Sequence, residues 1–231
     1  MMSQLKQNLD AVIKKINNAA IKSQRTPEDI TLIAVTKTYP VEVINEAIDL
    51  GVTDIGENKV QEIIEKYQYT KPVRWHLIGH LQTNKVKYII DKVYMIHSVD
   101  SIKLMDEIDK QAKKHNLIMN ILIQVNISGE ETKFGISPAE LDAMLEHAEG
   151  LSNVKVCGLM TIMPKVDNPI SNRLHFVNIK QIYIDISRKK YNNICMRHLS
   201  MGMSGDYEAA IEEGSNMVRI GSAIFGERKY N

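Results

Sequence analysis

Residues 119–125 (MNILIQV) form the clearest strand of the sequence, and residues 138–148 follow them as a helix. A short apolar run with β-branched side chains is typical of a strand buried on both faces, as in a parallel sheet. The same order of strand and helix recurs on both sides of this pair. The other expected strands are residues 31–35, 54–56, 74–78, 93–97, 154–159, 198–200 and 218–220. The other expected helices are residues 41–50, 59–67, a short one from 85, 101–114, 169–191 and 206–213.

Eight alternations of strand and helix within about 200 residues are typical of the α/β class, and of a (β/α)₈ TIM barrel in particular. A doubly wound sheet also alternates in this way, but its dinucleotide motif needs G-x-G-x-x-G directly after the first strand. This chain has Thr36, Lys37 and Thr38 there, so the barrel is favoured. We expect a single domain over residues 1–231. Apolar residues at helical spacing over residues 1–22 predict an extra N-terminal helix, within residues 1–24, that packs on the barrel.

The composition indicates a globular protein without a strong electrostatic preference. Of 231 residues, 44% are hydrophobic and 25% are charged, and 29 Lys and Arg oppose 28 Asp and Glu, for a net charge of +1. This balance argues against a nucleic-acid partner or an anionic membrane surface. Two isolated cysteines, Cys157 and Cys195, argue against a disulfide framework and for a reducing cytoplasm. Cys157 lies within an expected strand, and we expect it to be a small buried hydrophobe.

In a barrel, functional residues gather where strands end, and phosphate tends to bind after strands 7 and 8. Lys37 follows the first strand. Loss of solvation lowers the pKa of a lysine, and the neutral amine is the form that attacks an aldehyde. The alternative is a solvated lysine on a loop.

Residues 200–205 (SMGMSG) and the pair Gly221 and Ser222 supply hydroxyl and backbone N–H donors after the last two strands. Such turns bind anions, although glycine and serine also form tight turns without any ligand. Arg219 lies two residues before Gly221, and a salt bridge to a barrel carboxylate is an equal alternative for it. His76 and His80 lack the glutamate of the H-E-x-x-H motif, so we expect no metal site.

Six segments carry a resemblance to a known family and recur in order between residues 30 and 228. They are residues 34–38 (AVTKT), 55–62 (IGENKVQE), 75–85 (WHLIGHLQTNK), 158–161 (GLMT), 199–204 (LSMGMS) and 218–226 (VRIGSAIFG). With these segments the sequence resembles the pyridoxal-phosphate homeostasis proteins. That family is in turn similar to the barrel domains of bacterial alanine racemase and eukaryotic-type ornithine decarboxylase.

The resemblance implies an internal aldimine between Lys37 and pyridoxal 5′-phosphate (PLP), the cofactor form of vitamin B6. The cofactor-binding residues implied are Lys37, Asn58, His80, Met201, Ser204, Arg219, Gly221 and Ser222. Among them Ser204, Gly221 and Ser222 contact the phosphate, and Arg219 faces the pyridine nitrogen. Two positions depart from the family pattern: Tyr39 stands where many members have a second lysine, and Lys59 where many have tyrosine. These departures leave secondary cofactor contacts open.

Arg219 has a chemical consequence, because a guanidinium donates hydrogen bonds and does not accept a proton. A pyridine nitrogen facing it stays unprotonated, which makes the cofactor a weak electron sink. Racemisation also needs a second base, which alanine racemase takes from a further domain. This chain ends at Asn231, soon after the barrel, and nothing in the sequence aims Tyr207 at the substrate.

We therefore expect a cytoplasmic, monomeric protein that holds PLP without evident turnover, takes part in PLP homeostasis and delivers PLP to apo-enzymes. No catalytic residue is assigned. The first alternative is a PLP-dependent racemase or decarboxylase that lacks its second domain. The second is an aldolase that forms a Schiff base between its lysine and a sugar phosphate.

Overall fold

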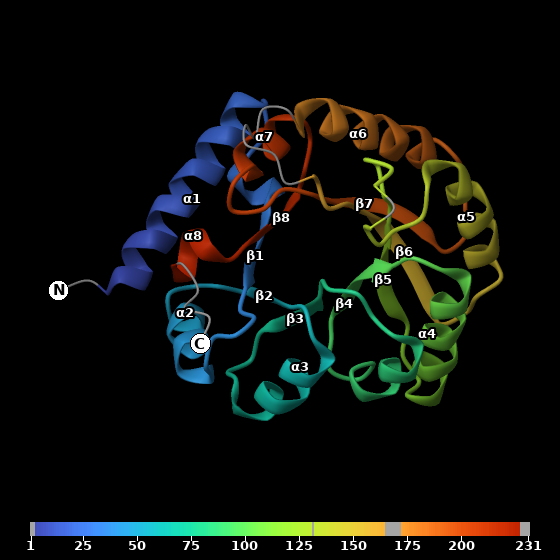
Figure 1. Cartoon of the computed structure of the whole chain (residues 1–231), viewed down its shortest axis with the longest axis horizontal. Helices are drawn as coiled ribbons and strands as arrows, with labels where there is room; N and C mark the ends of the chain where they lie inside the picture. Colours follow the sequence, from blue (N-terminus) through green and yellow to red (C-terminus); the bar gives the residue numbers. More distant parts are fainter. Residues whose placement is uncertain (1–2, 131, 165–171, 227–231) are drawn as a thin grey trace.

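The strands of the computed structural model, which describes residues 3–130, 132–164 and 172–226, form one closed parallel barrel in sequential order (Figure 1). The strands are β1 (Thr31–Val35), β2 (Asp54–Glu57), β3 (Arg74–Leu77), β4 (Met95–Val99), β5 (Met119–Gln124), β6 (Val154–Met160), β7 (Ile194–Ser200) and β8 (Met217–Ile220). The first and last strands close the barrel, where Ile33 lies in register with Arg219. The TIM-barrel prediction is therefore confirmed.

Helices surround the barrel, as the connections between parallel strands require (Figure 1). The α-helices are α1 (Gln4–Lys22), α2 (Val41–Asp49), α3 (Val60–Lys66), α4 (Ile102–Lys114), α5 (Leu141–Glu149), α6 (Arg173–Ser187), α7 (Tyr207–Glu212) and α8 (Ser222–Phe225). The 3₁₀ helices are η1 (Pro27–Asp29), η2 (Tyr67–Tyr69), η3 (Thr83–Tyr88) and η4 (Pro138–Glu140). Ser101 caps α4 through a hydrogen bond from the Leu104 N–H, as the sequence predicts.

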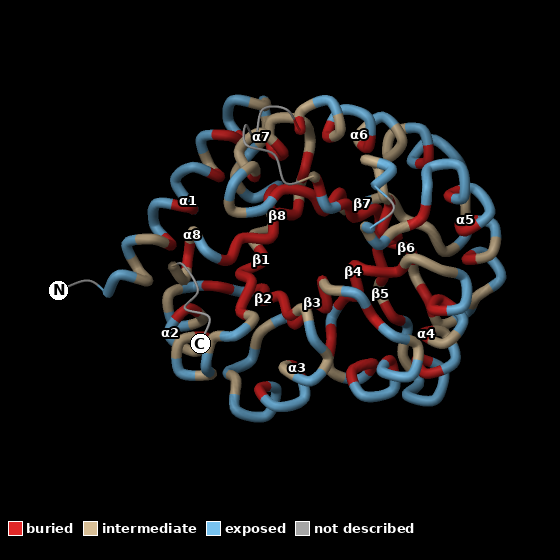
Figure 2. The backbone as a smooth tube through the Cα atoms, viewed as in Figure 1, coloured by how far each residue is buried: buried red, intermediate tan, exposed pale blue. Residues whose placement is uncertain are grey.

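The core has two parts, because successive side chains of a strand point to opposite faces of the sheet. Figure 2 shows the strands as a buried ring inside helices whose outer faces are exposed. The larger cluster lies between the barrel and its helices, and a smaller one consists of Ile33, Met95, Leu122, Cys157, Met160 and Met217. Burial raises the pKa of the Cys157 thiol to about 11, so Cys157 is an unreactive small hydrophobe, as expected.

The helix α1 packs on the outside of the barrel next to α7 and α8 (Figure 1). Its buried side chains are Leu9, Val12, Ile16, Ala19 and Ala20. The Asn8 side chain donates a hydrogen bond of 3.0 Å to the carbonyl of Ile224 in α8. The sequence predicts both this helix and its packing face, although Ile13 of the same stripe is 40% exposed.

Some boundaries differ from the sequence prediction. The strand β7 begins at Ile194 instead of residue 198, and the segment after residue 83 is a 3₁₀ helix. The sequence did not predict α8. The expected start of the sixth helix at residue 169 lies outside the described residues. None of the described helices has the length and apolar character needed to cross a membrane.

Candidate functional site

Lys37 lines a cavity of about 250 Å³ at the carboxyl-terminal end of the barrel. The other lining residues lie in or just after six of the strands: Val35, Asn58, Ile78, Ile162, Met203, Ser204, Gly205, Arg219, Gly221 and Ser222. Six of the eight predicted cofactor-binding residues therefore surround one space, namely Lys37, Asn58, Ser204, Arg219, Gly221 and Ser222. Side chains that are up to 185 residues apart in the sequence meet there because the strands of a parallel barrel all end at the same rim.

The other two predicted residues do not line this cavity. The His80 ring stacks on Phe134 with 3.8 Å between ring centroids, and its Nδ1 lies 3.3 Å from Asp100 Oδ2. Met201 is fully buried in the core, and Met203, two residues later, lines the cavity in its place. The loop after β7 bends at Gly202, and this bend decides which methionine faces inward.

Hydrogen bonds to two carboxylates fix the loop that carries Lys37. The Thr36 hydroxyl donates a hydrogen bond of 2.8 Å to Glu57 Oε1, and the Thr38 N–H donates one of 2.7 Å to Glu62 Oε2. Thr38 has φ +71°, in the left-handed region that β-branched residues rarely adopt. Two carboxylates from neighbouring segments thus hold a strained turn on both sides of Lys37.

Lys66 joins those two carboxylates. Its Nζ lies 2.8 Å from Glu57 Oε1 and 2.7 Å from Glu62 Oε2, and donates a further bond of 3.2 Å to the carbonyl of Thr36. Burial raises the pKa of Glu57 above its ordinary value, although Lys66 opposes the shift. Burial also acts to raise the pKa of Glu62, but hydrogen bonds from Lys66 and the Thr38 N–H lower it overall. We call these three residues the loop cluster.

The Arg219 side chain, on β8, also lines the cavity and is buried inside the barrel. Its Nη1 donates a hydrogen bond of 2.6 Å to Ser200 Oγ, and its Nη2 donates one of 2.9 Å to the carbonyl of Thr161. Burial lowers the pKa of Arg219 to about 10, so the side chain is a cation at neutral pH. No carboxylate of the described residues forms an ion pair with Arg219, so the alternative of a salt bridge is not supported. The Thr161 hydroxyl is buried without a hydrogen-bond partner among the described residues.

A line of buried polar side chains continues from Ser200 through the barrel interior. Ser200 Oγ lies 3.2 Å from His97 Nδ1, and His97 Nε2 lies 2.9 Å from His76 Nδ1. His76 Nε2 lies 2.9 Å from Asp54 Oδ1, and Arg74 pairs with the same carboxylate at 2.6 Å. We call Ser200, His97, His76 and Asp54 the interior chain.

The hydrogen bonds of the interior chain all run in one direction. Burial acts to raise the pKa of Asp54, but hydrogen bonds, first that from His76, lower it overall, so the carboxylate is ionised and only accepts. His76 must then donate from Nε2 and accept at Nδ1 from His97, and His97 in turn accepts from Ser200. Burial lowers the pKa of His76 and His97, which is consistent with two neutral rings. Arg219 is thus connected to an anion at the far end of the barrel.

Donors also meet beside Ser204. Its Oγ accepts hydrogen bonds from the N–H groups of Gly221 at 3.2 Å and Ala223 at 3.4 Å. The preceding Gly202 has φ +94°, and a Cβ there would lie 2.6 Å from the Cβ of Ala210. A glycine is therefore required for the tight turn that brings the Ser204 hydroxyl next to two backbone donors. Such an arrangement suits an anionic oxygen.

The two positions that depart from the family pattern lie outside this cavity. The Tyr39 ring lies against Phe225, with 4.8 Å between ring centroids, and its hydroxyl donates a hydrogen bond of 3.0 Å to the carbonyl of Gly226. Lys59 lines a neighbouring cavity. Tyr39 therefore links the Lys37 loop to the end of α8.

His76 and His80, the two histidines weighed for a metal site, lie in different surroundings. His76 belongs to the interior chain, whereas His80 is exposed outside the barrel. Across residues 3–130, 132–164 and 172–226, no group of three or more His, Cys, Asp or Glu side chains is arranged to hold a metal ion.

Comparison with known proteins identifies the family to which this barrel is similar. The family model described as "Alanine racemase, N-terminal domain" matches residues 7–229. A protein of Aquifex aeolicus (strain VF5) named "Pyridoxal phosphate homeostasis protein" is 46% identical over 97% of this chain and 98% of its own length. A protein of the same name from Escherichia coli (strain K12) is 38% identical over 100% of this chain and 99% of its own.

Solved structures of other proteins have the same fold as this chain. PipY of Synechococcus elongatus PCC7942, solved with PLP bound, has a TM-score of 0.82 and 30% identity over 96% of this chain and 100% of its own. An alanine racemase of Clostridium difficile 630 has a TM-score of 0.70 and 19% identity, over 98% of this chain and 57% of its own. The latter likeness concerns the fold alone.

Proposed function

This chain belongs to the alanine racemase N-terminal domain family and, within it, to the pyridoxal phosphate homeostasis proteins, and from this premise we propose that it holds PLP reversibly on Lys37. In this role it buffers the cofactor in the cytoplasm and delivers it to apo-enzymes that depend on PLP. The protein acts as a monomer, because one barrel supplies every residue of the proposed site.

One observation carries the proposal: an amine, a buried cation and a group of N–H and hydroxyl donors surround the same cavity. PLP supplies an aldehyde, which condenses reversibly with an amine and releases water. Lys37 offers that amine, and Ser204, Gly221 and Ser222 offer donors to the phosphate.

Arg219 would hold the pyridine nitrogen of the bound cofactor. Its pKa of about 10 keeps the guanidinium a donor at neutral pH, and two of its nitrogens are already fixed by Ser200 and Thr161. A ring nitrogen that accepts from this donor is not protonated, so carbanions formed on the cofactor gain little stabilisation. This environment favours carriage of the cofactor over reactions that need a strong electron sink.

The titratable side chains around the cavity also favour holding the cofactor over catalysing a reaction with it. Lys37 and Arg219 are the titratable side chains among the described residues that line the cavity. Tyr207, the tyrosine next to the Ser204 loop, is buried in the hydrophobic core, and burial raises its pKa to about 12. The described lining thus offers no second base opposite Lys37, as a racemase requires. We propose that turnover of amino acids is not the main role of this protein.

The test is covalent trapping of the cofactor. Purified protein incubated with PLP should absorb as a conjugated C=N bond, and borohydride should bleach this absorbance and fix one cofactor mass on the peptide that contains Lys37. Lys37→Ala should lose both signals. Lys103→Ala, at an exposed lysine of α4, is the matched control and should keep them.

Two results would contradict the proposal. Full trapping in Lys37→Ala would place the cofactor on another lysine. Steady turnover of a panel of L-amino acids by the wild-type protein, lost in Lys37→Ala, would instead favour a racemase or decarboxylase.

A further inference from the structure

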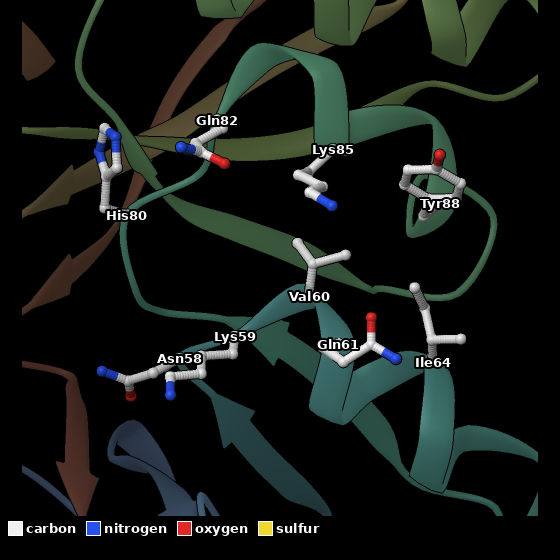
Figure 3. A pocket seen from close by; sticks show the side chains of 9 residues that line it. All are labelled: Asn58, Lys59, Val60, Gln61, Ile64, His80, Gln82, Lys85 and Tyr88. Atoms are coloured by element: carbon white, nitrogen blue, oxygen red, sulfur yellow. The ribbon is translucent and has the colours of Figure 1, made fainter.

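A second cavity, of about 520 Å³, lies beside the Lys37 cavity. It opens between α3 and η3, and its lining residues are Asn58, Lys59, Val60, Gln61, Ile64, His80, Gln82, Lys85 and Tyr88 (Figure 3). Its volume falls within the range of about 300–1,000 Å³ that is usual for small-molecule sites. The motifs at residues 55–62 and 75–85 meet here, although they contribute only Asn58 and Ile78 to the Lys37 cavity.

The charge of this second cavity is positive. Its described lining contains Lys59, Lys85 and His80 and no Asp or Glu. His80 already has Asp100 as a partner. Neither Lys59 nor Lys85 forms an ion pair within 4.0 Å with a carboxylate of the described residues, although Lys59 acts at longer range on Glu62. Two cationic side chains thus border a cavity that already offers three side-chain amides.

Apolar groups form the other wall. Val60 and Ile64 lie one helical turn apart on α3 and face Lys85 and Tyr88 of η3 across the cavity (Figure 3). Lys85 Nζ lies 5.6 Å from the centroid of the Tyr88 ring. Ile64 and Tyr88 are 36% and 43% exposed, so they offer apolar surface to a ligand. A flat ring that carries an anionic group matches this combination of wall and charge.

Asn58 connects the two cavities, because it lines both. Its backbone is held against the loop after β3, where a Cβ at Gly79 would lie 2.3 Å from the carbonyl oxygen of Asn58. Asn58 is therefore a shared lining residue of the two cavities, and its backbone is held in place at this point.

We propose that the second cavity is a non-covalent site for a phosphorylated ring compound of the same class as the ligand of Lys37, with Lys59 and Lys85 holding the phosphate. The compound rests there between Lys37 and the solvent. In its choice of ligand this inference rests on the proposed function.

The test uses protein whose Lys37 site is sealed. The protein is loaded with PLP and reduced with borohydride, so that Lys37 carries a permanent adduct. Pyridoxine 5′-phosphate, which has no aldehyde, is then titrated by calorimetry. We expect one further equivalent to bind, and the double variant Lys59→Gln/Lys85→Gln to bind about tenfold or more weakly, since each lysine supplies a charged contact to the phosphate.

Lys103→Gln/Lys113→Gln, at two exposed lysines of α4, is the matched control for the loss of two positive charges and should bind as the wild type does. Inorganic phosphate and unphosphorylated pyridoxine should each bind more weakly than the whole probe. Absence of binding to the sealed protein, or equal binding by the Lys59 and Lys85 double variant, would overturn the proposal. Binding of an acidic peptide without binding of the probe would also overturn it, in favour of a protein-docking surface.

The two proposals fail separately. If borohydride fixes no cofactor on Lys37, the proposed function fails. The titration is then made on the Lys37→Ala protein, where binding that depends on Lys59 and Lys85 would still support an anion site in the second cavity.

Discussion

The two sides of the Lys37 cavity are stabilised by different kinds of interaction. On the β1–β2 side, the loop cluster of Glu57, Glu62 and Lys66 holds the Lys37 turn through two carboxyl groups that share one lysine. On the β7–β8 side, Ser200, a neutral member of the interior chain, holds Arg219 and in turn contacts His97. In the proposed function the amine of Lys37 gains and loses a proton, whereas Arg219 stays a constant hydrogen-bond donor. The structure anchors the first through its backbone and the second through its own guanidinium.

The largest expected effect on stability comes from removing the central residue of the loop cluster, on the β1–β2 side. Lys66→Met removes the cation shared by two carboxylates, one of them fully buried, and should lower the free energy of unfolding by about 3–5 kcal/mol. Urea denaturation measures this loss. Lys71→Met, which breaks an exposed ion pair with Asp49, is the control and should cost about 1 kcal/mol or less. Equal losses in the two variants would mean that the loop cluster is no more than a surface pair.

A smaller effect should follow on the β7–β8 side. Ser200→Ala leaves a donor of Arg219 and Nδ1 of His97 without their partner, and each unsatisfied buried group costs about 1–3 kcal/mol. The absorbance of protein loaded with PLP should also change, because Arg219 loses one of its two fixed contacts. A variant with unchanged stability and unchanged absorbance would show that the interior chain does not position Arg219.

The pH dependence of stability tests the two buried histidines of the interior chain. Burial lowers the pKa of His76 and His97 in the folded state, so the unfolded chain takes up protons first as the pH falls below about 6.5. The unfolding free energy should be fully present above that pH and decrease below it, by at most about 1.4 kcal/mol per pH unit for each histidine. His97→Asn should reduce this slope in urea titrations between pH 5 and 8. An unchanged slope would assign the proton uptake to other groups, such as His198, whose pKa burial also lowers.

The sequence predicts the barrel and six residues of the cavity lining because both depend on local patterns. Short apolar runs separated by helical stripes locate the strands, and the residues just after them include Lys37, Ser204 and Gly221. The start of β7 at Ile194 is not visible in this way, since its apolar residues 194–196 are only partly buried and Arg197 and His198 separate them from the buried end of the strand.

The interactions that hold the site are long-range, and for that reason they were not predicted. Glu62 and Lys66 are four residues apart on a helix, a spacing that can be read from sequence, but their partner Glu57 lies in a strand. Ser200 and His97 are 103 residues apart and meet only because alternate side chains of different strands point into the barrel. The placement of Met203 instead of Met201 in the cavity depends on the turn at Gly202, which the residue pattern does not determine.

The first helix has a consequence for ligand retention. The Asn8 side-chain amide donates a hydrogen bond to the carbonyl of Ile224. In addition, Lys15 forms an ion pair with Glu208 of α7, and Lys22 forms one with Glu212. The helices α7 and α8 directly follow the Ser204 and Gly221 turns, so α1 supports from outside the two turns that we propose bind the phosphate of PLP. Detaching α1 from α7 and α8 should therefore raise the dissociation rate of the ligand without altering any group that contacts it.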